Sequence, residues 1–293
     1  VTRRKYVRAG ATVIGGSALA GCSDLVGEGS GGKQTPSGQG SYTASISPVG
    51  EVTFDSVPTD VMAYSPHYAD MLLALGHADS LTAMGFPDDY VSGIQYFTDS
   101  LDGVSFSGDG LTQMYNEGMD KELFYELDSD VHLMDPAWVV KSFDGWERSD
   151  IEEIAEKVGP WFANRFSRQH AQPPEEYRAG YRYYTLWELI EKISQVFQEA
   201  ERYQALEDEY KQLYGTIRAN LPPKAERPTV GLITYYDDKI YPYKISGPGF
   251  GKAHVRPMGA RDAFADSDKT YAENYEGSYD LEGLLEIDPD VLL

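Results

Sequence analysis

The sequence has a single cysteine, Cys22, in 293 residues. No disulfide can therefore form within the chain, and its stability must come from the burial of apolar side chains. The sequence also has no G-x-S-x-G, H-E-x-x-H or P-loop motif, and the glycine-rich stretch 247–251 lacks the Lys-Ser/Thr pair of a phosphate-binding loop. We therefore expect a protein that is not an enzyme. A secreted glycosidase with two facing carboxylates stays open as the best enzymatic alternative.

Positive charge is scarce in this chain. The 25 Lys and Arg residues against 47 Asp and Glu residues give a net charge of −22. Such a surface repels nucleic acid and anionic lipid headgroups, so we expect no nucleic-acid partner. It also suits a high-salt environment, where salt screens the self-repulsion. A halophilic source is expected, with an ordinary acidic secreted protein as the alternative.

The N-terminal residues 1–22 have the features of an export signal. Residues 2–7 resemble the twin-arginine signal. The apolar stretch 9–20 is shorter than the about 20 residues that span a membrane, so it predicts the core of a signal peptide and not an anchor. The sequence Leu-Ala-Gly-Cys then matches a lipobox in which Cys22 is acylated, with a lone buried thiol as the alternative. The Gly- and Ser-rich residues 23–47 predict a flexible tether.

Two stretches of the chain are alike. Residues 120–131 and 280–291 both begin with an acidic, helix-like segment and end in Asp-x-Asp-Val. Each predicts a short helix, a tight turn and a buried strand, at Val131–Met134 and at Val291–Leu293. Two copies so far apart suggest two similar lobes and not a solenoid, which needs three or more repeats at a short period. Chance similarity in an acidic chain is the alternative.

Strands and helices alternate along residues 48–184, which are predicted to form a first lobe. We expect a strand at 60–64, a helix at 67–75 capped by Gly76, a strand at 80–84 and a helix at 149–158 capped by Ser149. The stretch 88–115 stays unassigned. Strands that alternate with helices predict a parallel sheet.

Residues 185–221 carry apolar side chains in one stripe at helical spacing. Thr185 and Glu188 form a capping box at the start, and two prolines end the stripe. The pattern predicts one helix on the order of 54 Å long, a rigid spine between two lobes, with a solitary coiled-coil strand as the alternative. Residues 222–293 are predicted to form a second lobe that is incomplete, as in a truncated reading frame, with strands at 230–235 and 239–245 and a helix at 258–265.

These pieces together resemble the substrate-binding proteins of ABC importers for iron–siderophore complexes and cobalamin. The resemblance covers residues 50–293. It implies an α/β fold with two Rossmann-like lobes, each with a central parallel sheet, joined by one long rigid α-helix as in class III periplasmic binding proteins. It also implies that one exposed acidic residue of each lobe docks on the permease. By repeat position these residues are Glu122 and Glu282, and a solvated helix face is the alternative for both.

The resemblance places the ligand in the cleft between the lobes. Ligands of parallel α/β sheets lie beyond the carboxyl ends of the strands, and phenols and indoles suit a large chelate. Arginine suits an anionic one, because it pairs with carboxylates in a two-pronged fashion. For each aromatic residue taken alone, ordinary packing is the alternative. The candidate ligand-binding residues are Ser65, His67, Tyr68, Phe86, Asp135, Trp138, Arg165, Tyr235, Tyr236, Tyr241, Tyr243, His254 and Arg256.

A bare Zn²⁺, Mn²⁺ or iron ion is an alternative ligand, as are cobalamin and haem. The available histidines are His67, His77, His132, His170 and His254. Metal-binding relatives would use about three histidines plus a carboxylate, but no H-x-H or H-x-x-E spacing is present. We therefore predict no metal site and no cofactor.

The sequence as a whole predicts a monomeric solute-binding lipoprotein at the extracytoplasmic face of the cell membrane. Its expected partners are an ABC permease with its ATPase, a ferric siderophore or similar chelate, and the membrane through a lipid on Cys22. Function would consist of cleft closure around the ligand, an equilibrium that the ligand shifts by its differential affinity.

Overall fold

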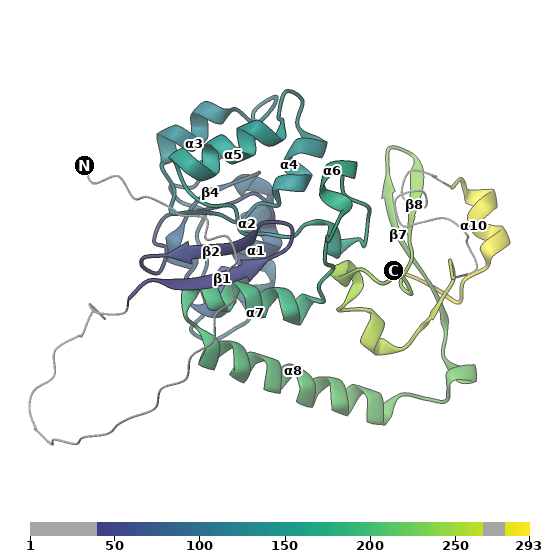
Figure 1. The fold of residues 1–293 in the computed structure, drawn as a ribbon. Coiled ribbons are helices and arrows are strands. Elements are labelled where there is room, and N and C mark those ends of the chain that lie inside the picture. The colour runs from purple at the N-terminus through teal and green to yellow at the C-terminus, as the bar shows by residue number, and fades with distance from the viewer. Residues whose placement is uncertain (1–39, 266–278) are drawn as a thin grey trace, which may run out of the picture.

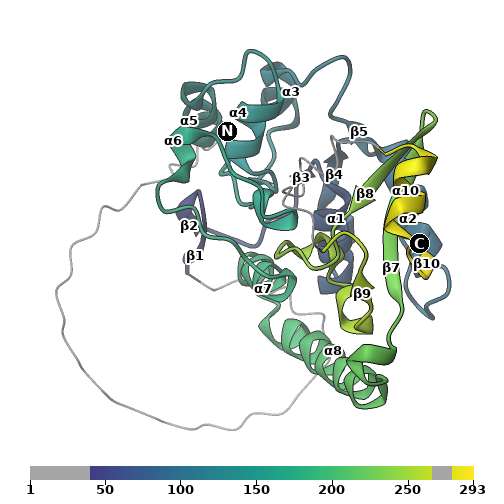
Figure 2. The same cartoon turned by 90° about the vertical axis from the view of Figure 1, so that its right-hand side faces the viewer.

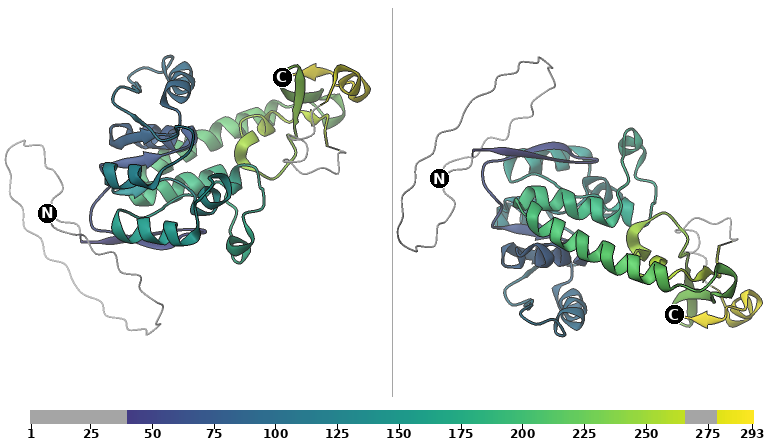
Figure 3. Two further views of the ribbon diagram at one scale, coloured as in Figure 1. Left: turned by 90° about the horizontal axis from the view of Figure 1, so that it is seen from above. Right: turned by 90° about the horizontal axis from the view of Figure 1, so that it is seen from below.

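The computed structural model describes residues 40–265 and 279–293. The signal-like segment, the lipobox with Cys22 and residues 23–39 of the expected tether lie outside the described residues. Two α/β lobes lie side by side, and helix α8 (Ala200–Asn220) runs beneath them from one to the other (Figures 1 and 3). No helix in the described part of the chain combines the length and the apolar character that crossing a membrane requires.

Lobe one is built on a parallel sheet, as the alternation of strands and helices predicts. Its strands are β3 (Val61–Ala63), β4 (Leu81–Met84), β5 (Thr112–Gln113) and β6 (Val131–His132). They lie in the order β5-β4-β3-β6, and every pairing is parallel. β3 and β6 are buried along their whole length because helices cover both faces of the sheet.

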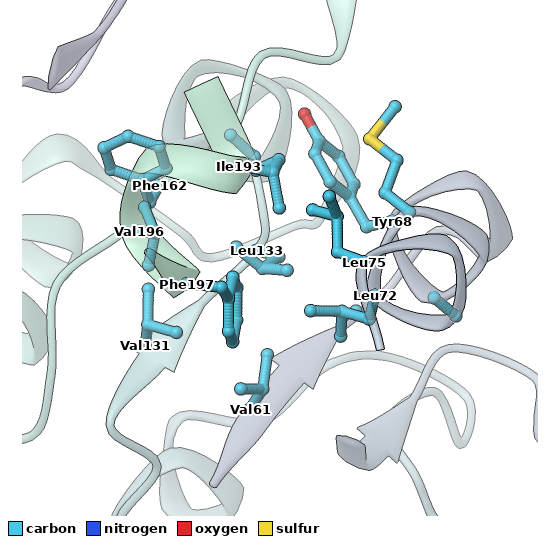
Figure 4. Close-up of a cluster of buried hydrophobic side chains, with 14 of the residues drawn as sticks. Val61, Tyr68, Leu72, Leu75, Val131, Leu133, Phe162, Ile193, Val196 and Phe197 are labelled. Carbon is cyan, nitrogen blue, oxygen red and sulfur yellow. The ribbon is translucent and has the colours of Figure 1, made fainter. Parts of the chain in front are cut away.

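Helices pack on both faces of this sheet. They are α1 (Pro66–Leu75), α2 (Pro87–Thr98), α3 (Lys121–Leu127), α4 (Pro136–Ser142), α5 (Arg148–Lys157) and α7 (Leu186–Phe197). The short α6 (Glu175–Arg178) has no buried residue. α1 and α7 share one core with β3 and β6 (Figure 4). Side chains of α3, α4 and α5 form the core of the opposite face. Gly76 ends α1 with a φ of 84°, as predicted for a C-terminal cap.

Three local expectations for this lobe need correction. The stretch 88–115, which the sequence left unassigned, contains most of α2 and all of β5. Helix α5 is capped by Glu147 with Asp150 three residues on, and Ser149 lies inside the helix. The expected tether 23–47 runs too far, because Tyr42–Ile46 is strand β1, paired with β2 (Gly50–Phe54) in a hairpin whose apolar side joins the core.

The prediction of one unbroken spine helix over 185–221 is wrong. Gln198 adopts a left-handed conformation with a φ of 60° and ends α7, and the chain reverses into α8. Trp187 of α7 and Tyr210 of α8 face each other at 4.8 Å between ring centroids, so the helices form an antiparallel hairpin (Figure 2). Two helices that face each other produce the same apolar stripe as one long helix. The Thr185–Glu188 capping box is confirmed.

Contacts with lobe one fix this reversal. His77, directly after α1, lies 2.9 Å from Glu199 through its Nε2, and the Arg202 guanidinium donates to the Ala74 carbonyl at 2.6 Å. α7 is part of the lobe-one core, whereas no residue of α8 is buried. The spine is therefore α8 alone, about 32 Å long.

Lobe two has a mixed sheet, with parallel and antiparallel pairs. Its strands are β7 (Thr229–Tyr236), β8 (Lys239–Tyr243), β9 (Arg261–Asp262) and β10 (Val291–Leu292), and its helix is α10 (Leu281–Ile287). β10 and β9 pair parallel with β7, and β8 pairs antiparallel with it across the Asp237–Asp238 turn, as predicted. The predicted helix at 258–265 is wrong, because this stretch holds the end of a short turn, then β9.

Single 3₁₀ turns connect these elements. They are η1 (Ala78–Ser80), η2 (Phe166–Arg168), η3 (Lys224–Glu226), η4 (Phe250–Lys252) and η5 (Arg256–Met258).

The two repeat copies share one helix–turn–strand plan, but the predicted burial of the second strand is wrong. Val131 is fully buried, whereas Val291, Leu292 and Leu293 are 39%, 48% and 59% exposed, because β10 lies at the edge of its sheet. Asp128 and Asp288 end their helices in the left-handed conformation, with φ values of 44° and 46°. Two residues on, the Asp130 and Asp290 carboxylates accept backbone N–H groups of Thr59 and Thr229, at 2.9 and 2.7 Å. Each strand that follows then pairs parallel with the strand that begins near this threonine. The internal similarity thus marks one helix–turn–strand unit in each lobe.

The reassignment of α7 to lobe one can be tested by mutation. Ile193 of α7 is fully buried in the lobe-one core. Ile193→Ala should therefore lower the free energy of unfolding by about 2–5 kcal/mol, measured by urea denaturation. Leu213→Ala on α8 is the control. Leu213 is 59% exposed, so its loss should cost no more than about 0.5 kcal/mol. Equal costs for both substitutions would contradict the assignment.

Candidate ligand-binding site

The carboxyl ends of the lobe-one strands bring most of the predicted residues together. Ser65 follows β3, Phe86 follows β4 and Asp135 follows β6. This edge of the sheet faces lobe two, since Phe250 of η4 packs edge-on against His67 at the start of α1, with the ring centroids 5.8 Å apart. Residues far apart in sequence therefore meet at one edge, as the fold class requires.

Aromatic rings line this edge. Tyr64 packs against Trp138 at 4.8 Å and against Phe86 at 5.9 Å, and Phe86 packs against Tyr115 at 5.2 Å. Trp138, Phe86 and Tyr115 are half-buried, so each keeps part of its surface open. The sequence predicted Trp138 and Phe86 but not Tyr64 or Tyr115. Tyr64 follows β3 directly, and Tyr115 lies two residues after β5, a strand of only two residues and too short for a sequence pattern.

Arg165 lies at the centre of this cluster. Its guanidinium lies over the Trp138 ring at 4.9 Å, and Nη1 donates to Ser65 Oγ at 2.7 Å. Burial and the nearby charge of Arg168 lower the pKa of Arg165. Within the described ranges, no carboxylate pairs with this guanidinium. The residue is thus a largely buried cation with N–H groups left for an anionic ligand.

Asp135 positions Arg165 and does not face a ligand. Its carboxylate is almost fully buried and accepts from the Ala137 N–H at 2.9 Å, the Arg165 N–H at 2.7 Å and the Tyr181 hydroxyl at 2.6 Å. Burial raises its pKa to about 6, although these hydrogen bonds oppose the shift. The expectation that Asp135 contacts ligand is therefore corrected to a positioning role.

Tyr68 is an interior residue, and His67 beside it is half-buried. Tyr68 is 1% exposed, and its hydroxyl accepts the Asn164 N–H at 2.7 Å, next to Arg165. His67 packs on Tyr68 with ring centroids 4.5 Å apart, and burial lowers its pKa well below the ordinary value. Its Nε2 is buried without a hydrogen-bond partner in the described chain. Tyr68 therefore supports the site from beneath, contrary to the prediction of ligand contact.

The four predicted tyrosines of lobe two divide between two faces of one hairpin. Thr234 pairs with Tyr241 and Tyr236 with Lys239, which puts Tyr236, Tyr241 and Tyr243 on one face. Tyr235 pairs with Ile240 on the opposite face, where Ile240 packs against Leu284 of α10. The four therefore do not share one face, and Tyr235 lies on the opposite side from the other three.

Arg256 shapes a loop. Its guanidinium donates to the carbonyls of Ile245, Gly247 and Gly249, at 3.2, 2.6 and 2.6 Å. The sequence assigned it to an anionic ligand, but most of its N–H groups are used by the 245–249 backbone. His254 is exposed beside this loop.

A cavity of about 430 Å³ lies between this loop and the η2 segment of lobe one. Arg168 and Lys252 line it, and the sequence analysis named neither. Both lie in irregular segments that carry no sequence motif. The only hint in the sequence was that basic residues are few in this acidic chain. A second cavity, of about 450 Å³, lies inside lobe one between the β1–β2 hairpin and residues 176–181.

The five histidines do not form a metal site. His132 is buried between Phe124 and Trp161, and His170 stacks on Tyr183 at 4.0 Å. His77 pairs with Glu199. In the described part of the chain, no three His, Cys, Asp or Glu residues are placed to hold a metal ion.

Glu122 and Glu282 occupy equivalent positions. Each lies in the first turn of its repeat helix, and both are exposed. The structure thus presents one such carboxylate on each lobe, as a docking role would require.

The buried carboxylate of Asp135 makes a prediction for stability. Its folded-state pKa of about 6 lies above the ordinary value of 3.8, so the folded protein holds this proton to higher pH than the unfolded chain. The resulting stabilisation is present at low pH and is lost as the pH rises through about 6. The stability of the wild type relative to Asp135→Asn should fall by about 1 kcal/mol between pH 5 and 7.5, measured by urea denaturation. Asp144→Asn, at an exposed position, should show no such trend, and a pH-independent difference for Asp135→Asn would contradict the assignment.

No family model matches the chain, and no curated protein matches its sequence. Solved structures match its fold. The iron uptake ABC transporter substrate-binding protein PiuA from Streptococcus pneumoniae superimposes with a TM-score of 0.59 at 14% identity, over 87% of this chain and 77% of that one. The siderophore-binding protein BauB, solved with acinetobactin and ferric iron, gives 0.57 at 14% identity, over 86% and 75%. The haem-binding protein HmuT gives 0.54 at 13% identity, over 89% and 72%.

At these identities the match establishes the fold. The chain has the two-lobed α/β fold of the substrate-binding proteins of ABC importers.

Proposed function

We propose that this protein is an extracytoplasmic solute-binding protein that captures a ferric chelate between its lobes and delivers it to an ABC permease. The carrying observation is Arg165, a largely buried cation over the Trp138 ring at the sheet edge that faces lobe two. The chain has the fold of proteins named for iron uptake and siderophore binding, which supports an iron chelate as the solute.

The chemistry of this edge suits a bulky, partly aromatic, oxygen-rich ligand. Trp138, Phe86 and Tyr115 offer ring faces for stacking, and Arg165 offers charged donors for the oxygens of a chelate. Tyr236, Tyr241 and Tyr243 on one face of the β7–β8 hairpin would supply further phenol groups from lobe two. The proposal includes a lipid anchor at Cys22, as expected from its lipobox, which would hold the protein at the membrane.

Haem is the second candidate, because a haem-binding protein has the same fold. Haem iron needs an axial histidine, tyrosine, cysteine or methionine. Tyr236 and His254 are exposed and in lobe two, so they are the residues that would be tested first.

Substitution of Arg165 tests the proposed function. Arg165→Gln removes the charge, and its affinity for a ferric chelate that the wild type binds should fall at least about 30-fold, since losing a buried charge partner costs 2–5 kcal/mol. Titration with ferric siderophores, cobalamin and haem, followed by quenching of tryptophan fluorescence, gives the dissociation constants. Arg218→Gln on α8 is the control and should leave affinity unchanged, because Arg218 lies over Tyr214, away from the site. If the wild type binds no iron complex, the proposal fails.

The docking role of the repeat helices gives a separate prediction. Glu122→Gln with Glu282→Gln should leave ligand affinity unchanged and raise at least about 10-fold the concentration that half-saturates ligand-stimulated ATP hydrolysis by the permease in vesicles. Glu126→Gln with Glu286→Gln is a matched control, since both residues are exposed on the same two helices. An equal effect of both pairs would indicate a general charge effect and contradict specific docking.

A further inference from the structure

The cavity between the lobes is lined by positive charge in a strongly acidic protein. The chain has a net charge of −22, yet the cavity has five basic lining residues and, in the described ranges, no acidic one. It encloses about 430 Å³. The basic lining residues are Arg168, His170, Lys244, Lys252 and Arg256.

Two of these cations have no counter-ion in the described part of the chain. Neither Arg168 nor Lys252 forms an ion pair there, and the Lys252 ammonium lies over the Tyr243 ring, 3.8 Å from its centroid. Burial and the charge of Arg168 lower the pKa of Lys252 to about 8. Arg168 also lowers the pKa of Arg165. The charge of Arg168 therefore acts on a cation of each lobe, Arg165 and Lys252, and no described carboxylate of this acidic chain is paired with any of the three.

The cavity is held in shape without these two cations. Arg256 uses its guanidinium to gather three backbone carbonyls of the 245–249 loop. Gly249 lies so close to lobe one that a Cβ there would lie 2.4 Å from the Arg168 carbonyl oxygen. Phe250 next to it is buried against the lobe-one core. Arg256 and the glycine-rich loop therefore build the wall, which leaves Arg168 and Lys252 available to a ligand.

We infer that this cavity is an oxyanion-binding site in which Arg168 and Lys252 form the paired cations, one from each lobe. A carboxylate or similar oxyanion there would bridge the lobes and supply the missing negative charge. If the ligand is an iron chelate, as in the proposed function on which this part rests, the site selects a chelate that carries free negative charge. A neutral tris-hydroxamate would not meet this requirement. The same chemistry would also bind a free inorganic anion.

The test measures binding of four probes to the full chain by isothermal titration calorimetry. The probes are ferric citrate, a ferric tris-catecholate, a neutral ferric tris-hydroxamate and inorganic phosphate. We expect an anionic iron complex to bind at least about 10-fold more tightly than the neutral one, since hydrogen bonds to charged groups contribute about 1.5–3 kcal/mol. Arg168→Gln and Lys252→Gln should each weaken binding of the anionic complex at least about 10-fold and leave the neutral complex unaffected.

Three further variants guard against a loss of folding. Lys252→Arg keeps the charge and should keep most of the affinity. Lys224→Gln and Arg218→Gln remove exposed charges elsewhere and should change nothing. Thermal unfolding of each variant without ligand should resemble that of the wild type, since Arg168 and Lys252 make no ion pair with a described residue.

The outcomes separate this inference from the proposed function. If iron complexes bind regardless of charge and the Arg168 and Lys252 variants bind equally well, the oxyanion site is overturned and the proposed function stands. If only phosphate binds and both substitutions abolish it, the site stands for a free anion and the chelate proposal fails. If no anion binds, or if phosphate binds equally to Arg168→Gln and Lys252→Gln, the site is overturned.

Discussion

The organisation of both lobes depends on one repeated hydrogen bond. In each repeat unit, an aspartate two residues after a left-handed turn accepts the backbone N–H of a threonine at or just before the start of the neighbouring strand. This bond sets the register of a parallel strand pair, Val61 with Val131 in lobe one and Val230 with Val291 in lobe two. One residue of slip would turn every side chain to the other face, so Asp130 and Asp290 stabilise the register in which Val131 and Val230 are buried.

A buried carboxylate, that of Asp135, connects this strand order to the candidate site. Asp135 follows the strand that Asp130 places, caps α4, and holds both the Arg165 backbone and the Tyr181 hydroxyl. The strand register in lobe one therefore fixes where the Arg165 guanidinium lies relative to Trp138. Three hydrogen bonds to the Asp135 carboxylate therefore hold the lobe-one side of the site in place.

The cleft of this protein is basic, although the chain as a whole is strongly acidic. Acidic residues dominate the chain, but the groups that meet between the lobes are Arg165, Arg168 and Lys252. Their mutual repulsion costs free energy in the absence of ligand, and an anion that enters would remove this cost.

The connection between the lobes also differs from a plain rod, because α7 packs in the core and only α8 spans the gap. His77 and Arg202 fix the reversal between them, so α8 leaves lobe one in a defined direction.

The sequence by itself determined the features that depend on local chemistry. Period and capping predicted β3, α1, the Thr185 cap and the β7–β8 hairpin, and internal similarity predicted the repeat units, because these depend on residues close in the chain. Only the tertiary structure decided where α7 ends. No glycine or proline lies at Gln198 to mark the end in the sequence, and Phe197, the last residue of the helix, is buried in the core. It also decided which candidates face a ligand. Neighbouring segments bury Asp135 and Tyr68 almost completely, whereas Arg165 keeps part of its surface open. Arg168 and Lys252 line one cavity only because two lobes distant in sequence come together.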